Sequence, residues 1–115
     1  MKRRWRFYQT PSGRKPVSEF LDRLSADDAA AITSAMKDVA EIGLSGARHL
    51  RKDIYEVRTE GDRQAFRILF ATEGKYGHVL LALESFSKKT QKTPPEKVTL
   101  AQRRLDDWRR RGDHR

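Results

Sequence analysis

Residues 53–86 read DIYEVRTEGDRQAFRILFATEGKYGHVLLALESF, and this stretch decides the fold. Side chains alternate at its start, with Tyr55 and Val57 on one face and Glu56 and Arg58 on the other, the period of two that is typical of a strand. Turn signals at 60–62 and 74–77 separate this strand from a second at 64–71 and a third at 78–86. The third is nearly continuous in apolar residues, which favours a strand covered on both faces. The stretch therefore predicts three consecutive antiparallel strands.

Upstream of this stretch, the sequence predicts one more strand and a pair of helices. Residues 5–10 are aromatic-rich and end at a Pro-Ser-Gly turn, and Ser18 then opens a short helix. A second helix starts at Ser25, where Asp28 three residues later gives a capping-box-like pattern. Its single apolar stripe is spaced by four and three residues, and glycines are expected to end it: Ile32, Met36, Val39, then Gly43 and Gly46.

Downstream, Thr93-Pro94-Pro95-Glu96 predicts the start of a last helix, with Thr93 as its cap and Glu96 reaching back to it. One apolar stripe would dock this helix: Val98, Ala101, Leu105 and Trp108. We therefore expect an α+β fold, a small antiparallel sheet in the order β-α-α-β-β-β-α with the helices packed on it. At 115 residues, we expect one domain, 1–115.

The composition indicates a polyanionic partner. The chain has 25 Lys and Arg against 16 Asp and Glu, a net charge of +9, which attracts nucleic acid, an acidic protein or an anionic membrane surface. No apolar run approaches the roughly 20 residues of a membrane span and no signal-like segment follows the basic N-terminus, so we expect no membrane association and a cytoplasmic protein. The absence of cysteine excludes disulfides and thiolate-metal sites.

Several kinds of catalytic site are missing. The histidines, His49, His78 and His114, lack paired metal-ligand spacing, and we interpret them as surface or strand-end residues. There is no phosphate-binding glycine loop followed by lysine and no elbow-type serine. We expect neither a metal nor another cofactor.

Cations inside apolar strands are the main candidates for function. Arg67 lies between Phe66 and Ile68, Arg58 lies across a short hairpin, and Lys88 and Lys89 follow the most apolar strand. If the strands are neighbours, these four cations converge, an arrangement that suits a phosphodiester. The alternative is structural: Arg67 pairs with a carboxylate such as Glu56 or Glu84, and the two lysines are solvated.

Three ordered motifs carry a resemblance to a known family. They are Ile54-Tyr55-Glu56-Val57-Arg58, Phe66-Arg67-Ile68-Leu69-Phe70 and the run from Phe86 to Pro94, FSKKTQKTP. Together they resemble the HigB-like, phage-derived branch of the RelE/ParE toxin superfamily of type II toxin–antitoxin systems, over roughly residues 4–106. The resemblance implies a metal-independent endoribonuclease (an mRNA interferase) that cleaves mRNA, commonly on the ribosome, by attack of the ribose 2′-hydroxyl on the adjacent phosphate.

The resemblance also implies roles for individual residues. Arg67 and Lys89 would act on the scissile phosphate, Arg58 would assist, and Lys88 would steer the RNA backbone. RNA binding would involve Lys88, Lys92, Arg103 and Arg104. The acid and base stay open, with Glu56 or Lys88 as candidate bases, because the C-terminal tyrosine of some members has no counterpart here.

The expected partners are mRNA, the ribosome and a cognate antitoxin, of helix-turn-helix type or acidic, that covers the cationic face. Two other functions remain open: a non-catalytic toxin like the gyrase-poisoning ParE proteins, and a basic nucleic-acid-binding module whose binding depends on salt but yields no product.

Overall fold

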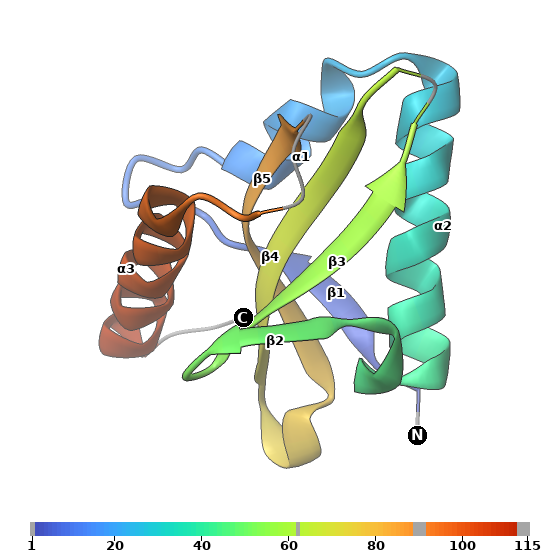
Figure 1. Cartoon of the computed structure of the whole chain (residues 1–115). Helices are drawn as coiled ribbons and strands as arrows, with labels where there is room; N and C mark the ends of the chain where they lie inside the picture. The colour runs from blue at the N-terminus through green and yellow to red at the C-terminus, as the bar shows by residue number, and fades with distance from the viewer. Residues whose placement is uncertain (1, 62, 89–91, 113–115) are drawn as a thin grey trace.

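Three helices pack on a five-stranded sheet in the computed structural model of the protein (Figure 1). The structure describes residues 2–61, 63–88 and 92–112, with only the backbone described at Lys88. The elements in chain order are β1 (Arg4–Phe7), α1 (Pro16–Asp22), α2 (Ala26–Ile42), β2 (Arg48–Arg51), β3 (Ile54–Glu60), β4 (Ala65–Glu73), β5 (Val79–Lys88) and α3 (Pro95–Arg111), with short 3-10 turns at Leu44–Gly46 and Lys75–Gly77.

The spatial order of the strands is β1-β5-β4-β3-β2. All neighbouring pairs are antiparallel except β1 and β5, which run parallel. The predicted α+β class and the predicted order of elements are confirmed. The structure adds two features that the sequence did not reveal: the short edge strand β2, and the parallel pairing that makes the sheet mixed.

The cap of α2 and the apolar stripes of α2 and α3 follow their sequence signals. Ser25 caps α2, since its hydroxyl accepts a hydrogen bond of 3.2 Å from the backbone N–H of Asp28. Gly43 ends this helix at φ 109°, a conformation that residues with a Cβ rarely adopt. The predicted apolar stripes are the buried faces of their helices: Ile32, Met36 and Val39 on α2, and Val98, Ala101, Leu105 and Trp108 on α3.

Three local predictions differ from the structure. Helix α1 begins at Pro16 with Lys15 in the cap position, so Ser18 lies inside the helix and does not open it. β1 ends at Phe7 rather than Thr10, although the Tyr8 N–H still bonds to the Ala82 carbonyl at 2.9 Å. Thr93 does not cap α3: the cap position is Pro94, and the Thr93 hydroxyl instead donates to the carboxylate of Glu56 on β3. The prediction of a cap was wrong because a tertiary contact competes for the same hydroxyl.

The sheet has a core on each face. Helices α1 and α2 cover one face, where they pack on side chains such as Val57, Phe66 and Ile68. Helix α3 covers part of the other, where it packs on Ile54, Leu69 and Leu83. Figure 1 shows α2 and α3 on opposite sides, with β2 crossing beside the start of β3. Among the described helices, none is both long and apolar enough to cross a membrane.

Candidate active site

Arg58 and Arg67 lie directly opposite each other on β3 and β4. Strand alternation puts Arg58 on the face of Ile54 and Arg67 on the face of Leu69, and both of these belong to the core under α3. The two arginines are therefore on one face, as expected. Two like charges in opposite positions of a sheet repel, so their proximity needs a compensating anion.

Glu56 supplies that anion. Its carboxylate is fully buried, with Oε1 at 2.6 Å from Arg58 Nε and Oε2 at 3.9 Å from Arg67 Nε. The Thr93 hydroxyl donates to Oε2. Since both carboxylate oxygens accept hydrogen bonds, Glu56 is poorly placed to serve as the general base. One carboxylate shared by two guanidinium groups leaves the cluster of Glu56, Arg58 and Arg67 with an excess of one positive charge.

Arg67 is almost completely buried, with 2% of its side chain exposed. Its Nη1 donates to the Phe66 carbonyl at 3.2 Å, but within the described part of the chain its Nε finds no acceptor at hydrogen-bonding distance. The separation of 3.9 Å from Glu56 is too long for a hydrogen bond. The structural alternative for Arg67, a pair with Glu56, is thus present, but only as a long ion pair.

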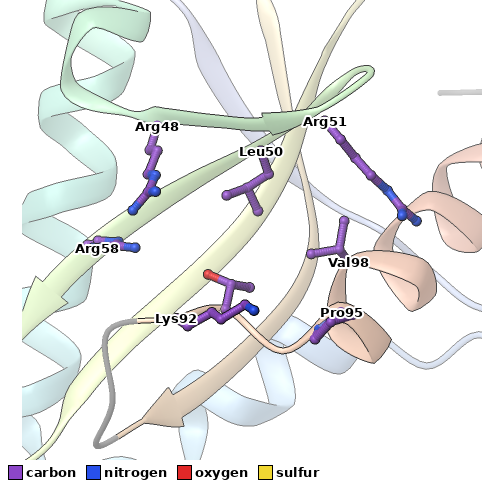
Figure 2. Close-up of a pocket in the computed structure, with 8 residues that line it drawn as sticks. Arg48, Leu50, Arg51, Arg58, Lys92, Pro95 and Val98 are labelled. Carbon is purple, nitrogen blue, oxygen red and sulfur yellow. The ribbon is translucent and has the colours of Figure 1, made fainter.

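Arg58 connects this cluster to an open cavity. The cavity has a volume of about 460 Å³ and lies between β2, β3 and the start of α3 (Figure 2). Its described lining is mostly cationic or apolar: Arg48, Leu50, Arg51, Arg58, Lys92, Thr93, Pro95 and Val98. Arg58, 29% exposed, reaches the cavity, whereas Arg67 is not among the lining residues.

The lining has no acidic member among the residues that the structure describes. Nor does any described carboxylate come within 4 Å of the charged groups of Arg48, Arg51 or Lys92. Four cations around one cavity produce a positive potential that an anion would relieve.

The remaining predicted residues lie in different places. Lys92 is exposed and lines the cavity. Strand β5 ends at Lys88, whose backbone lies opposite Ala65, two residues before Arg67 on β4. Lys89 lies outside the described residues. Arg103 is exposed on α3. Arg104 is bound to the sheet: its Nη1 donates to the Leu83 carbonyl at 2.8 Å and to Glu84 at 3.3 Å.

The histidines bond locally where they are described. A ring nitrogen of His49 lies 2.6 Å from the Lys52 carbonyl, and one of His78 lies 2.7 Å from the Lys75 carbonyl. His114 lies outside the described residues. Across the described chain, no group of three or more histidine or acidic side chains is placed to hold a metal ion.

Arg48 and Arg51 were missed by the sequence analysis. Both come from β2, which is only four residues long. The available signal was a lone apolar Leu50 between cations, followed by Lys52-Asp53 as a turn into β3. A strand this short gives too few alternations to be recognised from periodicity.

Comparisons with known proteins agree with this fold and site. A family model described as phage-derived protein Gp49-like (DUF891) matches residues 19–106, most of the chain. The chain belongs to the Gp49-like family. The matched segment contains the cluster of Glu56, Arg58 and Arg67 and all of the described residues that line the cavity.

Two curated relatives carry the name "Probable endoribonuclease HigB1", from Mycobacterium tuberculosis strains CDC 1551 / Oshkosh and ATCC 25618 / H37Rv. Each is 32% identical to this Gp49-like chain over 110 residues, covering 92% of the chain and 85% of the relative. The resemblance to the HigB-like, phage-derived branch of the RelE/ParE toxin superfamily is thereby confirmed.

Proposed function

We propose that this protein is the toxin of a type II toxin–antitoxin system and acts as a metal-independent endoribonuclease on mRNA. The observation that carries the proposal is the cluster of two guanidinium groups around one buried carboxylate, opening through Arg58 into a cation-lined cavity. The relatives named as probable endoribonucleases support the same activity.

The reaction needs positive charge beside the non-bridging oxygens of the scissile phosphate. The ribose 2′-hydroxyl loses its proton as its oxygen attacks phosphorus, the bond from phosphorus to the 5′-oxygen breaks, and that oxygen takes up a proton. The products are a 2′,3′-cyclic phosphate and a 5′-hydroxyl. Negative charge builds on the non-bridging oxygens in the transition state, where fixed cations stabilise it. Because Arg58 faces the cavity, we place it in contact with these oxygens, and we keep Lys89 as a second cation for the same phosphate, the role that the sequence resemblance implies.

Arg67 would act without touching the RNA, from the position opposite Arg58 on β4. Its buried charge adds to the positive potential at the phosphate. Because Glu56 pairs with Arg67 as well as with Arg58, its carboxylate neutralises the charge of Arg58 less completely.

Lys88, Lys92 and Arg103 would guide the RNA backbone, as their charges favour phosphate. Arg104 is already bound to Glu84 and to the Leu83 carbonyl, so we leave it out of the RNA path.

Such an enzyme would act in the cytoplasm, with mRNA on the ribosome as substrate. A cognate antitoxin, of helix-turn-helix type or acidic, would neutralise it by covering the cationic cavity. The net charge of +9 favours an antitoxin surface rich in carboxylates.

Incubation of the purified chain with mRNA, with and without ribosomes, tests the proposal, and EDTA is added only to the reactions without ribosomes because ribosomes themselves require Mg²⁺. We expect cleavage that resists EDTA, with cyclic phosphate and 5′-hydroxyl ends identified by end-specific labelling. Salt-sensitive binding without product would contradict the nuclease and favour a binding module. Damage to DNA gyrase without RNA cleavage would favour a ParE-like toxin.

A further inference from the structure

We propose that the cavity between β2 and the start of α3 is a nucleotide subsite, which binds one nucleotide of the RNA beside the scissile phosphate. In this subsite Arg48 contacts the phosphate of the bound nucleotide, and its base lies over Leu50 and Val98. Arg51, whose guanidinium group lies on the other side of Leu50 (Figure 2), contacts the edge of the base. The inference rests on the proposed function, since it names how the same site holds its substrate.

The first support is an irregularity in β2. Arg48 pairs with Glu56 and His49 with Tyr55, but the next pair is Arg51 with Ile54, so the register shifts between His49 and Arg51. Regular alternation would put Arg48 and Arg51 on opposite faces. The shift brings both to the α3 face, where both line the cavity with Leu50 (Figure 2). Bulges near functional sites commonly redirect a side chain in this way.

The second support is the turn that follows. Lys52 has φ of 47°, in the left-handed region that residues with a Cβ rarely adopt. The His49 ring bonds to the Lys52 carbonyl at 2.6 Å and braces this conformation. Lys52 opens the two-residue turn between β2 and β3, where tight hairpins require φ > 0. The braced turn holds Arg51 at the end of β2, where it lines the cavity.

The third support is the chemistry of the lining. Leu50, Pro95 and Val98 give an apolar surface, while Arg48, Arg51, Arg58 and Lys92 give charge. A nucleotide has the matching parts, a planar base and an anionic phosphate, and RNA-binding proteins stack single-stranded bases on guanidinium planes as well as on aromatic rings. The volume of about 460 Å³ falls within the roughly 300–1,000 Å³ that is usual for small-ligand sites.

The position of the cavity selects RNA over an acidic peptide. Arg58 belongs both to the lining and to the Glu56 cluster, so a nucleotide in the cavity would be covalently continuous with a phosphate at Arg58. An acidic peptide would use the cations but would gain nothing from this continuity.

Calorimetric titration of the full chain with adenosine 3′-monophosphate, inorganic phosphate and a hexaglutamate peptide tests the subsite. We expect the nucleotide to bind more tightly than either of the others. Arg48→Ala and Arg51→Ala should each weaken nucleotide binding roughly tenfold, because each removes a charge-assisted hydrogen bond. Leu50→Ser should weaken nucleotide binding but leave phosphate binding unchanged. The control is Lys37→Ala, an exposed cation on α2, which should bind nucleotide as the wild type does.

The RNA cleavage assay separates this inference from the proposed function. If RNA is cleaved but Arg48→Ala and Arg51→Ala, shown to be folded, bind nucleotide normally and keep the wild-type KM, the subsite is refuted and the nuclease stands. If these variants lose nucleotide binding but the wild type cleaves no RNA, the subsite stands and the nuclease fails. Tighter binding of the peptide than of the nucleotide would also overturn the subsite and assign the cavity to a protein partner.

Discussion

Two buried carboxylates on the α3 face, Glu56 and Glu84, each form ion pairs with two cations. The two clusters differ in which elements the cations come from and in what lies beside them. Glu84 bonds Lys97 at 3.1 Å and Arg104 at 3.3 Å, both from α3, and so ties that helix to β5. Glu56 pairs with two arginines of the sheet itself, at 2.6 Å from Arg58 and at the much longer distance of 3.9 Å from Arg67. The Glu56 cluster also adjoins a cavity whose described lining includes three further cations, Arg48, Arg51 and Lys92.

Whether a cation in a strand or helix has a functional or a structural role depends on the groups that surround it. Both clusters contain two cations and one carboxylate. Around Glu84 the cations connect two elements at hydrogen-bonding distance, which is sufficient reason for their presence. Around Glu56 the cations lie on neighbouring strands, where they repel each other, and continue into a cavity whose described lining has no carboxylate.

The largest expected effect is on catalysis. Arg67→Ala should lower the single-turnover rate of RNA cleavage by about 100-fold or more, the usual effect of removing one group that stabilises transition-state charge. Because Arg67 is buried, the alanine variant risks unfolding, so Arg67→Lys is the companion. This variant keeps the charge and should retain more activity than alanine. Undiminished cleavage by a folded Arg67→Ala protein would remove Arg67 from the site.

The two carboxylates should respond differently to neutralisation. Glu84→Gln should lower the free energy of unfolding by roughly 1–3 kcal/mol, since it breaks a partly buried ion-pair network, with little change in phosphate affinity. Glu56→Gln should also destabilise, because two buried guanidinium groups lose their counter-ion, but it should bind inorganic phosphate more tightly than the wild type. Urea unfolding and calorimetry measure the two quantities. Equal phosphate affinity in both variants would mean that the clusters do not differ as proposed.

The salt dependence of RNA binding gives a finer measure of the cavity. Lys92→Ala should reduce the slope of log K against log salt by about 0.7, the value expected when the protein neutralises one phosphate fewer on a single strand. Lys37→Ala on α2 serves as the control of equal charge, and its slope should match that of the wild type. Equal slopes for Lys92→Ala and the wild type would place Lys92 outside the RNA path.

The smallest effect concerns a hydrogen bond far along α3. The Tyr8 hydroxyl donates to Asp107 at 2.7 Å, and this bond, followed by the nearby Arg111 charge, holds the pKa of the Asp107 carboxyl below its usual value. Because the pKa of Asp107 is lower in the folded than in the unfolded protein, its ionised carboxylate stabilises the folded state above the unfolded pKa. This contribution to the free energy of unfolding is lost as the pH falls below about 4. Tyr8→Phe should cost about 1 kcal/mol at neutral pH and weaken that acid dependence, as measured by unfolding between pH 2 and 7. RNA cleavage should not change.

Much of the fold was predictable because its elements carry strong local signals. The Ser25 cap and the α3 stripe are read from spacing alone, and the three strands predicted within 53–86 follow from alternation and turns. β2 was missed because four residues give little periodicity, and the parallel pairing of β1 depends on contacts distant in sequence.

The site was partly predictable. The strand positions of Arg58 and Arg67 follow from the pattern, and their shared face follows from the hairpin register. The sharing of Glu56, the redirection of Thr93 to that carboxylate and the entry of Arg48 and Arg51 into the cavity depend on tertiary geometry and on a register shift that no local pattern encodes.

The most direct measurement of the difference between the clusters is single-turnover RNA cleavage by two matched variants, Arg58→Ala and Lys97→Ala. Each removes one cation from one carboxylate cluster, and unfolding curves would show that both proteins are folded. We predict that Arg58→Ala loses about 100-fold or more in rate, whereas Lys97→Ala cleaves at close to the wild-type rate. Normal cleavage by Arg58→Ala, or an equal loss in both variants, would contradict the assignment of the Glu56 cluster as the phosphate site.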